Sequence, residues 1–278
     1  MFCSDHSDGE GSNWDGKPGR GEPCQEPYNE MQSAISSYTT AQVAPSDGNG
    51  FSNASLIKMA CRSDGRLLQP SAPARAIDAS FALSGGPEPR VKNVHAIMAT
   101  HTKLELTQWA QVLVIGLNAS FNLTPAHLAG EISPDDQVEH LVWSGYQQSN
   151  GIGKAPPNIT LRQAPFSAAA PLTIQKCGYS DFGLYQIAPI FKKSGAAFLG
   201  EIGKWVPVSA ARVSSVREAT EEEAQVTSLV VEIVGEASEP VELAFAKKGS
   251  AKPVTVLCKI PAAGVSSQSP PLHCDYQE

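Results

Sequence analysis

The sequence predicts a mainly β protein: an antiparallel β-sandwich preceded by a short helical segment. Beyond about Val91 many short stretches have the composition of strands, turn-forming residues separate them, and helical spacing occurs mainly before this point. Residues 241–246 and 254–260 alternate apolar and polar side chains, so each stretch can bury one face. The polar connection 247–253 makes these two stretches an antiparallel hairpin.

The expected organisation along the chain has four parts. They are a flexible lead-in at 1–26, a helical segment at 27–90, a β-sandwich domain at 91–261 and a flexible tail at 262–278. Pro27 suits the first position of a helix. Its apolar residues at helical spacing predict one buried stripe, formed by Tyr28, Met31, Ile35 and Tyr38.

A second helix is predicted after a loop at 45–50, with Ser52 as its cap and a stop at Asp64-Gly65. The residues that it would turn inward are Leu56, Ile57 and Ala60. A Pro/Gly-rich loop with an Asp, a short helix and an Asp-Gly turn before dense strands are typical of the end of a (β/α) barrel. We therefore interpret the helical segment as a remnant of such a barrel end.

The predicted strands fill the region after Val91. They are 94–100, 109–117, 140–146, 172–177, 184–191, 197–202, 228–234, 241–246 and 254–260. Residues 112–115 are apolar on both faces, which predicts a central, covered strand.

The composition bears on the class of partner. A formal net charge of −7 opposes a nucleic-acid surface, which needs clustered Lys and Arg. No apolar run is long enough to span a bilayer, so we expect no membrane partner. A hydrophobic content of 41% is sufficient for a sizeable core.

The cysteines and the N-terminal residues bear on the compartment. The six cysteines are far apart in sequence: Cys3, Cys24, Cys61, Cys177, Cys258 and Cys274. Reduced thiols are the favoured interpretation, and a disulfide framework is the alternative. Residues 1–27 have no apolar signal-peptide core, so we expect a cytoplasmic protein. N-glycosylation triplets at Asn53, Asn118, Asn122 and Asn158 point the other way, but such triplets also arise by chance.

Asp47 is one candidate site residue. Glycoside chemistry usually needs two carboxylates, one to protonate the leaving oxygen and one to attack or to activate water. Asp47 lies in a loop where a barrel strand would place such a group. From these residues alone, the favoured interpretation is that Asp47 stabilises a turn with its glycine neighbours.

The aromatic residues offer a second kind of site. Exposed rings can stack on sugar faces, whereas buried rings supply core area. Burial is the favoured interpretation for each of these residues taken individually: Trp109, Trp143, Tyr146 and Trp205. Trp205 is the first candidate for an exposed ring, because Gly203-Lys204 precedes it, and it is the one that we assign to substrate binding.

We expect no metal and no organic cofactor. The close pairs Cys3 with His6 and His273 with Cys274 lie in the expected flexible ends. Three histidines lie on or beside predicted strands, where a structural histidine is the favoured interpretation: His95, His101 and His140. The sequence has no glycine loop followed by Lys-Ser or Lys-Thr that would hold a phosphate.

Several segments, in order, resemble the C-terminal part of the raffinose synthase and alkaline α-galactosidase family of glycoside hydrolases. Residues 28–50, ending Ala44-Pro45-Ser46-Asp47-Gly48-Asn49-Gly50, resemble the last barrel helix of the family and its Ser-Asp loop. Asp64-Gly65-Arg66-Leu67-Leu68-Gln69-Pro70 and Asp78-Ala79-Ser80-Phe81 resemble two later motifs. Leu184-Tyr185-Gln186-Ile187-Ala188-Pro189-Ile190 and Ser194-Gly195-Ala196-Ala197 resemble the Leu-Ala-Pro-Ile and Gly-Gly-Ala stretches of the family.

This resemblance implies transfer or hydrolysis of α-galactosyl groups, with a carbohydrate as the partner. The paired carboxylates of the family lie on earlier barrel strands, and a complete barrel takes about 250 residues, more than precede Val91. We therefore expect a fragment, a truncated product or a family member without its catalytic half. Such a chain would be inactive alone, with Asp47 as a substrate contact.

Two other interpretations remain open. One is a carbohydrate-binding or scaffolding module that uses the sandwich and its aromatic residues. The other is a chain without function, whose helix has an apolar stripe that lacks its barrel partner and drives self-association.

Overall fold

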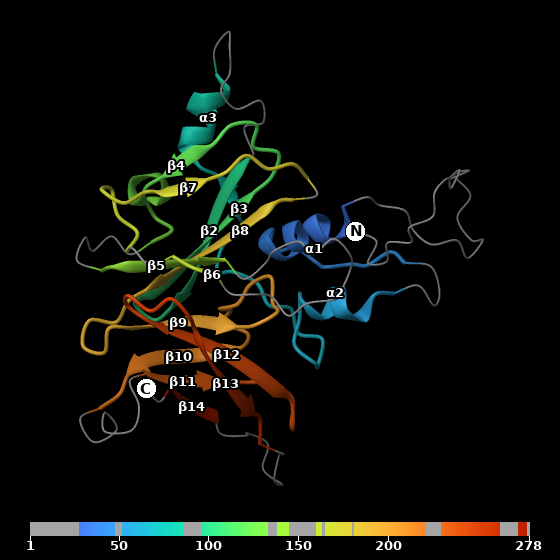
Figure 1. The fold of residues 1–278 in the computed structure, drawn as a ribbon. Helices are drawn as coiled ribbons and strands as arrows, with labels where there is room; N and C mark the ends of the chain where they lie inside the picture. The colour runs from blue at the N-terminus through green and yellow to red at the C-terminus, as the bar shows by residue number, and fades with distance from the viewer. Residues whose placement is uncertain are drawn as a thin grey trace.

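The computed structural model describes residues 28–47, 52–85, 96–132, 138–144, 160–162, 165–179, 181–220 and 229–261, together with the backbone of 272–276. The protein is mainly β with antiparallel sheets and few helices, as the sequence predicts (Figure 1). The predicted lead-in at 1–26 and Tyr146 lie outside the described residues.

The largest sheet has six antiparallel strands. Their order is β1 (Arg75–Ala76), β2 (Ile97–Leu104), β3 (Thr107–Val114), β8 (Gly183–Pro189), β5 (His140–Ser144) and β6 (Thr160–Leu161). The prediction of a central strand is confirmed, because β3 lies between β2 and β8 and its last six residues are buried. The helical segment also contributes β1 to this sheet, so it is not separate from the strands that follow.

Three smaller sheets complete the β structure. They are β10 (Val213–Glu218), β11 (Leu229–Ile233) and β14 (Leu272–Tyr276); β13 (Val254–Lys259), β12 (Pro240–Lys247) and β9 (Ala196–Glu201); and β4 (Phe121–Leu123) with β7 (Leu172–Ile174). The predicted hairpin is confirmed, with Leu243 opposite Val256. Within the tail predicted at 262–278, β14 pairs with β11 along its whole length.

The helices precede most of the sheet strands. They are α1 (Asn29–Tyr38), α2 (Ala54–Lys58), α3 (Asp78–Ser84) and a 3-10 turn, η1 (Pro125–Leu128). The first two were predicted, but Asn53 rather than Ser52 caps α2, since its side chain accepts hydrogen bonds from the amides of Ser55 and Leu56. The predicted stripe on α1 holds for Met31 and Tyr38, whereas Tyr28 is exposed.

The two faces of the six-stranded sheet bury different partners. On β3, Ala110, Val112 and Val114 face a core that also contains residues of β4, β7 and η1. The alternate residues Trp109 and Leu113 face the opposite side, where they join two separate cores. Trp109 belongs to the core shared with β9 to β13, and Leu113 to the core shared with α1 and α2.

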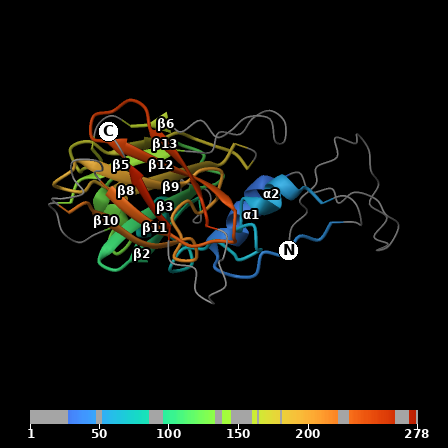
Figure 2. The same ribbon diagram turned by 90° about the horizontal axis from the view of Figure 1, so that it is seen from below.

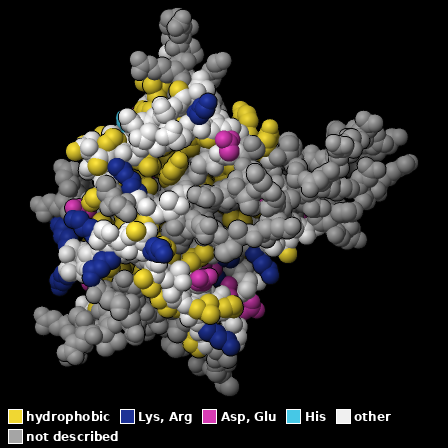
Figure 3. All heavy atoms as spheres, in the orientation of Figure 1, with side chains coloured by type: hydrophobic (Ala, Val, Ile, Leu, Met, Phe, Trp, Pro, Cys, Tyr) yellow, Lys and Arg dark blue, Asp and Glu magenta, His cyan; other side chains and the backbone are white. Residues whose placement is uncertain are grey.

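The figures show how these parts are placed. Strands β9 to β14 lie together at one end of the molecule, and α3 lies at the opposite end near β4 (Figure 1). Helices α1 and α2 lie beside each other on one side of the sheets in both ribbon views (Figure 2). Lys and Arg side chains lie at several places on the face shown in Figure 3, with hydrophobic and acidic side chains between them. Among the described residues, no helix is long and apolar enough to cross a membrane.

Candidate functional site

A row of buried polar side chains crosses the sheet between the two cores on this face. Register places Thr100 of β2 opposite Gln111 of β3, and Gln111 opposite Gln186 of β8. All three side chains are buried. Gln186 Nε2 donates a 3.0 Å hydrogen bond to the hydroxyl of Tyr38, which is itself buried on α1. Gln186 therefore joins α1 to the sheet through a neutral hydrogen bond.

Trp205 belongs to the same contact region. Its ring is 1% exposed, and its indole nitrogen donates to Ser33 Oγ at 2.9 Å. Its carbonyl accepts a 3.0 Å hydrogen bond from the Tyr38 hydroxyl. The expectation that Trp205 is exposed for sugar stacking is therefore wrong. The turn at Gly203 exists, with φ +75°, but the chain that leaves it directs the ring toward α1 instead of solvent.

The remaining predictions for aromatic side chains divide clearly. Trp109 and Trp143 are 3% and 4% exposed, which confirms the prediction of burial. Trp109 also satisfies its indole nitrogen by donating to the Phe198 carbonyl at 2.9 Å. The large aromatic residues that are exposed are Tyr28, Phe81 and Tyr179.

Asp47 lies between α1 and α2 and is half-buried. It follows Pro45, which forms an isolated bridge, and it is the last described residue before the gap at 48–51. The structure thus places Asp47 in the predicted loop and Trp205 in the core behind α1.

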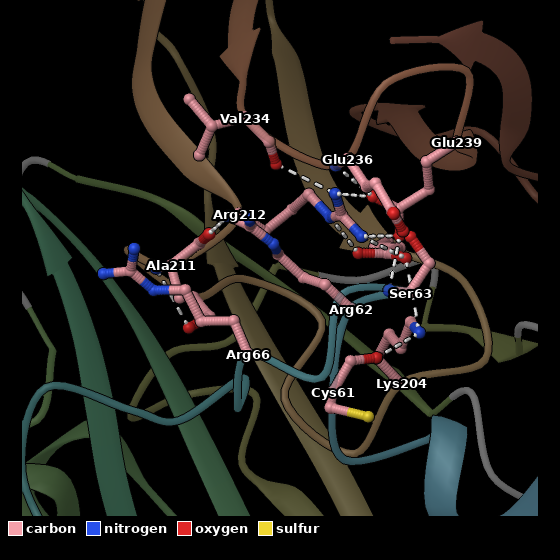
Figure 4. A network of polar contacts seen from close by, with 12 residues as sticks. Cys61, Arg62, Ser63, Arg66, Lys204, Ala211, Arg212, Val234, Glu236 and Glu239 are labelled. Carbon is pink, nitrogen blue, oxygen red and sulfur yellow. Dashed lines mark hydrogen bonds and ion pairs between the residues drawn. The ribbon is translucent and has the colours of Figure 1, made fainter.

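A charged network joins residues 61–66 to the strands (Figure 4). Arg212 is fully buried in the turn before β10. Its Nε donates to Glu201 Oε2 at 2.7 Å, and its Nη2 donates to Glu239 Oε1 at 2.6 Å. Both glutamates are also buried, at 5% and 8% exposure. One guanidinium therefore neutralises two carboxylates through charge-assisted hydrogen bonds.

The same network holds the loop after α2. The Ser63 amide donates to Glu239 Oε1 at 2.9 Å, and Arg62 Nη1 donates to the Ala211 carbonyl at 2.7 Å. Lys204 Nζ lies 3.6 Å from Glu201 Oε1 and donates to the Cys61 carbonyl at 2.7 Å. These contacts connect the loop to the segment that follows β9 and to the residue that precedes β12.

Gly235 makes room for this network. A Cβ atom at this position would overlap Arg212 Nη1 and Glu239 Oε2. The absence of a side chain is therefore required for the close approach of the Arg212 guanidinium to the backbone, where Nη1 also donates to the Val234 carbonyl at 2.8 Å.

The electrostatics of Glu239 follow from these contacts. Burial alone would raise its pKa, but hydrogen bonds from Arg212 and from the Ser63 amide, together with the Arg212 charge, lower the pKa to about 2. Although burial would lower the pKa of Arg212, its carboxylate partners raise it. Glu239 is therefore ionised at neutral pH and cannot act as a general acid there.

Glu201 and Glu239 are thus unsuitable as a glycosidase carboxylate pair. Both bond the same guanidinium, and both are buried among the strands that hold it. A general acid must retain its proton at the operating pH, and the second carboxylate must reach the substrate or an attacking water. We conclude that the network is structural.

A second ionic cluster lies at the sheet margin. His101 Nδ1 lies 2.7 Å from Glu131 Oε2, and Arg75 Nη2 lies 2.9 Å from Glu131 Oε1. Glu131 is buried, whereas the side chain of Arg75 is 72% exposed. These contacts connect β1, β2 and the turn after η1, in agreement with a structural interpretation of His101.

His140 is a buried histidine on β5. Burial, opposed by a weaker hydrogen bond that the ring donates to the Val138 backbone, lowers its pKa to about 4, so it is neutral at physiological pH. Its Nε2 is buried without a hydrogen-bond partner. This placement fits a structural residue.

The cysteines differ in state. Cys61 and Cys177 are free, and burial raises the pKa of both thiols. Cys258 is disulfide-bonded, so the expectation of reduced thiols is wrong for this residue. The expected cytoplasmic location depended in part on reduced thiols and loses that support.

Neither a metal site nor a relative identifies the protein. Among the described residues, no group of three or more His, Cys, Asp or Glu side chains is arranged to hold a metal ion. No family model matches the chain, and a search of curated proteins finds no match.

Arg212, Glu201 and Glu239 were not predicted as site residues from the sequence. One signal was present: Glu201 is the last residue of β9 and directly follows the apolar part of that strand. A carboxylate at the end of a fully buried strand needs a cation as its partner, but the sequence does not identify which Lys or Arg is that partner.

Proposed function

We propose that this chain is the β-rich C-terminal portion of a raffinose synthase-like glycoside hydrolase, in which the helical segment is the end of a (β/α) barrel and the strands form a sandwich. The chemistry of the complete enzyme is transfer or hydrolysis of α-galactosyl groups. In this role the chain supplies the β domain and the support for the last part of the barrel, with Asp47 as a substrate contact.

One observation carries the proposal: segments that resemble the family meet in space. Tyr38 lies in the first such segment and Gln186 in a later one, and their side chains share the 3.0 Å hydrogen bond. Gln69 lies in a third segment, and its side-chain Nε2 donates to the carbonyl of Ala41, in the first segment, at 2.7 Å. Motifs that occur in family order and also pack together support a common origin better than isolated matches do.

The proposal includes inactivity of the chain alone. Among the described residues, the buried carboxylate pair is held by Arg212, and Asp47 by itself cannot serve as both acid and nucleophile. Purified chain is expected to give no turnover of an aryl α-galactoside. Turnover that Asp47→Ala abolishes would contradict this part of the proposal.

The decisive experiment is long-read sequencing of the transcripts that encode Met1. The proposal predicts a reading frame that continues upstream and encodes two carboxylates on barrel strands, and a longer product that turns over an aryl α-galactoside. In that product, replacement of either carboxylate by its amide should abolish turnover. An upstream frame without such carboxylates, or a longer product without activity on α-galactosides, would overturn the proposal.

A second candidate function is a carbohydrate-binding or scaffolding module. The buried tryptophans give it no support, because Trp109, Trp143 and Trp205 are all in cores. The observation that favours it is an exposed aromatic pair, Tyr28 and Tyr179, whose ring centroids are 5.6 Å apart.

A further inference from the structure

Tyr28 and Tyr179 form an aromatic surface from two distant parts of the chain. Tyr28 directly precedes α1, and Tyr179 lies in the connection between β7 and β8. Their rings are inclined at 42° and are 37% and 48% exposed. Aromatic contact explains why the two rings lie together, but it leaves a large part of each ring facing solvent.

The position of Tyr179 is set by the backbone around it. Its ring lies over Gly116, where an added Cβ would come within 3.5 Å of two ring carbons. Gly116 has φ +64°, a conformation that favours glycine, and its amide donates to the Gly178 carbonyl at 3.0 Å. The ring is therefore held before any ligand arrives, which reduces the entropy cost of binding.

A carboxylate lies two residues after Tyr179 in the chain. Asp181 is exposed, and its Oδ1 accepts a hydrogen bond from the amide of Gly178, the residue before Tyr179. Within the described part of the chain, neither its Oδ2 nor the hydroxyls of Tyr28 and Tyr179 have a hydrogen-bond partner. The surface thus combines two apolar ring faces with one free carboxylate oxygen and two phenol hydroxyls.

We propose that the surface formed by Tyr28, Tyr179 and Asp181 binds a terminal α-galactosyl group. A pyranose has a C–H face that can lie on an aromatic ring and a rim of hydroxyls that can donate to a carboxylate. A neutral, hydroxyl-rich ligand suits a protein of net charge −7 better than an anionic one does. The choice of galactose over other sugars depends on the proposed function, whereas the aromatic surface itself does not.

The test is a titration of the full chain with methyl α-galactoside and raffinose, followed by saturation-transfer NMR. Methyl α-glucoside is the matched sugar. We expect saturation of the galactosyl protons and about tenfold weaker binding in Tyr179→Ala. Tyr28→Ala should also weaken binding. Phe81→Ala removes an aromatic side chain that is 57% exposed elsewhere and should leave affinity unchanged.

Asp181→Asn tests the charge of the carboxylate separately from the role of this side chain in the turn. The amide oxygen can still accept from Gly178, so the turn should remain, whereas loss of the charge should weaken sugar binding several-fold. An unchanged circular dichroism spectrum and unfolding midpoint would show that each variant is folded.

Three other results would contradict either the proposed surface or the choice of sugar. Affinity that is unchanged in Tyr179→Ala, or no binding of any sugar, would overturn the proposed surface but leave the proposed function to its own test of the reading frame. Equal binding of methyl α-glucoside would overturn the assignment to α-galactosyl groups.

Discussion

The helical segment is held to the sheets at two places that differ in their chemistry. At α1 the contacts are neutral and involve Tyr38, Gln186 and Trp205. At residues 61–66 they are ionic and depend on Arg212 and Glu239. Neutral hydrogen bonds each contribute little net free energy, whereas a buried charge is costly to leave without its partner. The comparison predicts that variants of the ionic contact lose more stability and respond to pH.

The largest expected effect is that of Arg212→Ala. The substitution leaves two buried carboxylates without a cation, so we expect a loss of about 4 kcal/mol in the free energy of unfolding. Urea denaturation measures this loss. The control is Lys248→Ala, which breaks the ion pair with Glu139 in which both side chains are 48% exposed, and which should cost less than about 1 kcal/mol. Equal losses in the two variants would show that the buried Arg212 network contributes no more to the free energy of unfolding than an exposed ion pair does.

The next effect is a dependence of stability on acid. The pKa of Glu239 is about 2 in the folded protein, below its ordinary value of 4.5. Its contribution is therefore complete above pH 4.5 and is lost as the pH falls toward 2, with a total of about 3 kcal/mol.

This dependence can be measured by denaturation between pH 6 and pH 2. Glu239→Gln should flatten the slope below pH 4.5. A slope that is the same in the variant and in the wild-type protein would exclude Glu239 as its source. His140 adds a loss of stability at higher pH. Its pKa is about 4 in the folded protein and 6.5 when exposed, so the unfolded state takes up the proton first and stability falls as the pH drops from 6.5 toward about 4.

Gly235→Ala tests the same contact by steric means and should have an intermediate effect. The new methyl group would displace Arg212 or Glu239, and overpacking of this kind costs about 2 kcal/mol. Gly249→Ala is not a suitable control, because Gly249 has φ +81° and any side chain there is strained. Ala251→Gly, at an exposed position, is the control and should change the free energy of unfolding little. A Gly235→Ala variant with wild-type stability would mean that the network tolerates displacement.

The smallest effect is expected at the neutral contact. Tyr38→Phe removes the hydroxyl that joins Gln186 to the Trp205 carbonyl, so we expect a loss of about 1.5 kcal/mol without a change in the acid dependence. The double variant Tyr38→Phe/Gln186→Leu should recover part of this loss, because the buried amide that lacks a partner is also removed. A larger loss in the double variant than the sum of the single ones would contradict this explanation.

The sequence was sufficient for the elements whose pattern is local. The alternation in β12 and β13 and the apolar run in β3 predict their strands, because one or both faces of each are buried. It was insufficient for β10 and β14. Their polar residues conceal the period, and pairing with β11 stabilises them as strands.

The candidate site was less predictable for a related reason. Gly203-Lys204 correctly indicates a turn before Trp205, but the direction of the ring depends on Ser33, which is far away in the sequence. The side-chain and carbonyl partners of Arg212 likewise come from two separate segments, the end of β9 and the connection between β11 and β12. Such contacts depend on the tertiary packing and have no fixed spacing in the sequence.

The most direct measurement of the central claim, that the helical segment and the sheets form one unit, is native-state hydrogen exchange. We predict that the protected amides of α1 and of β3 open with the same free energy, and that Arg212→Ala lowers both by the same amount. Exchange of α1 through a much less costly opening, with β3 still protected and α1 unaffected by the substitution, would contradict the claim.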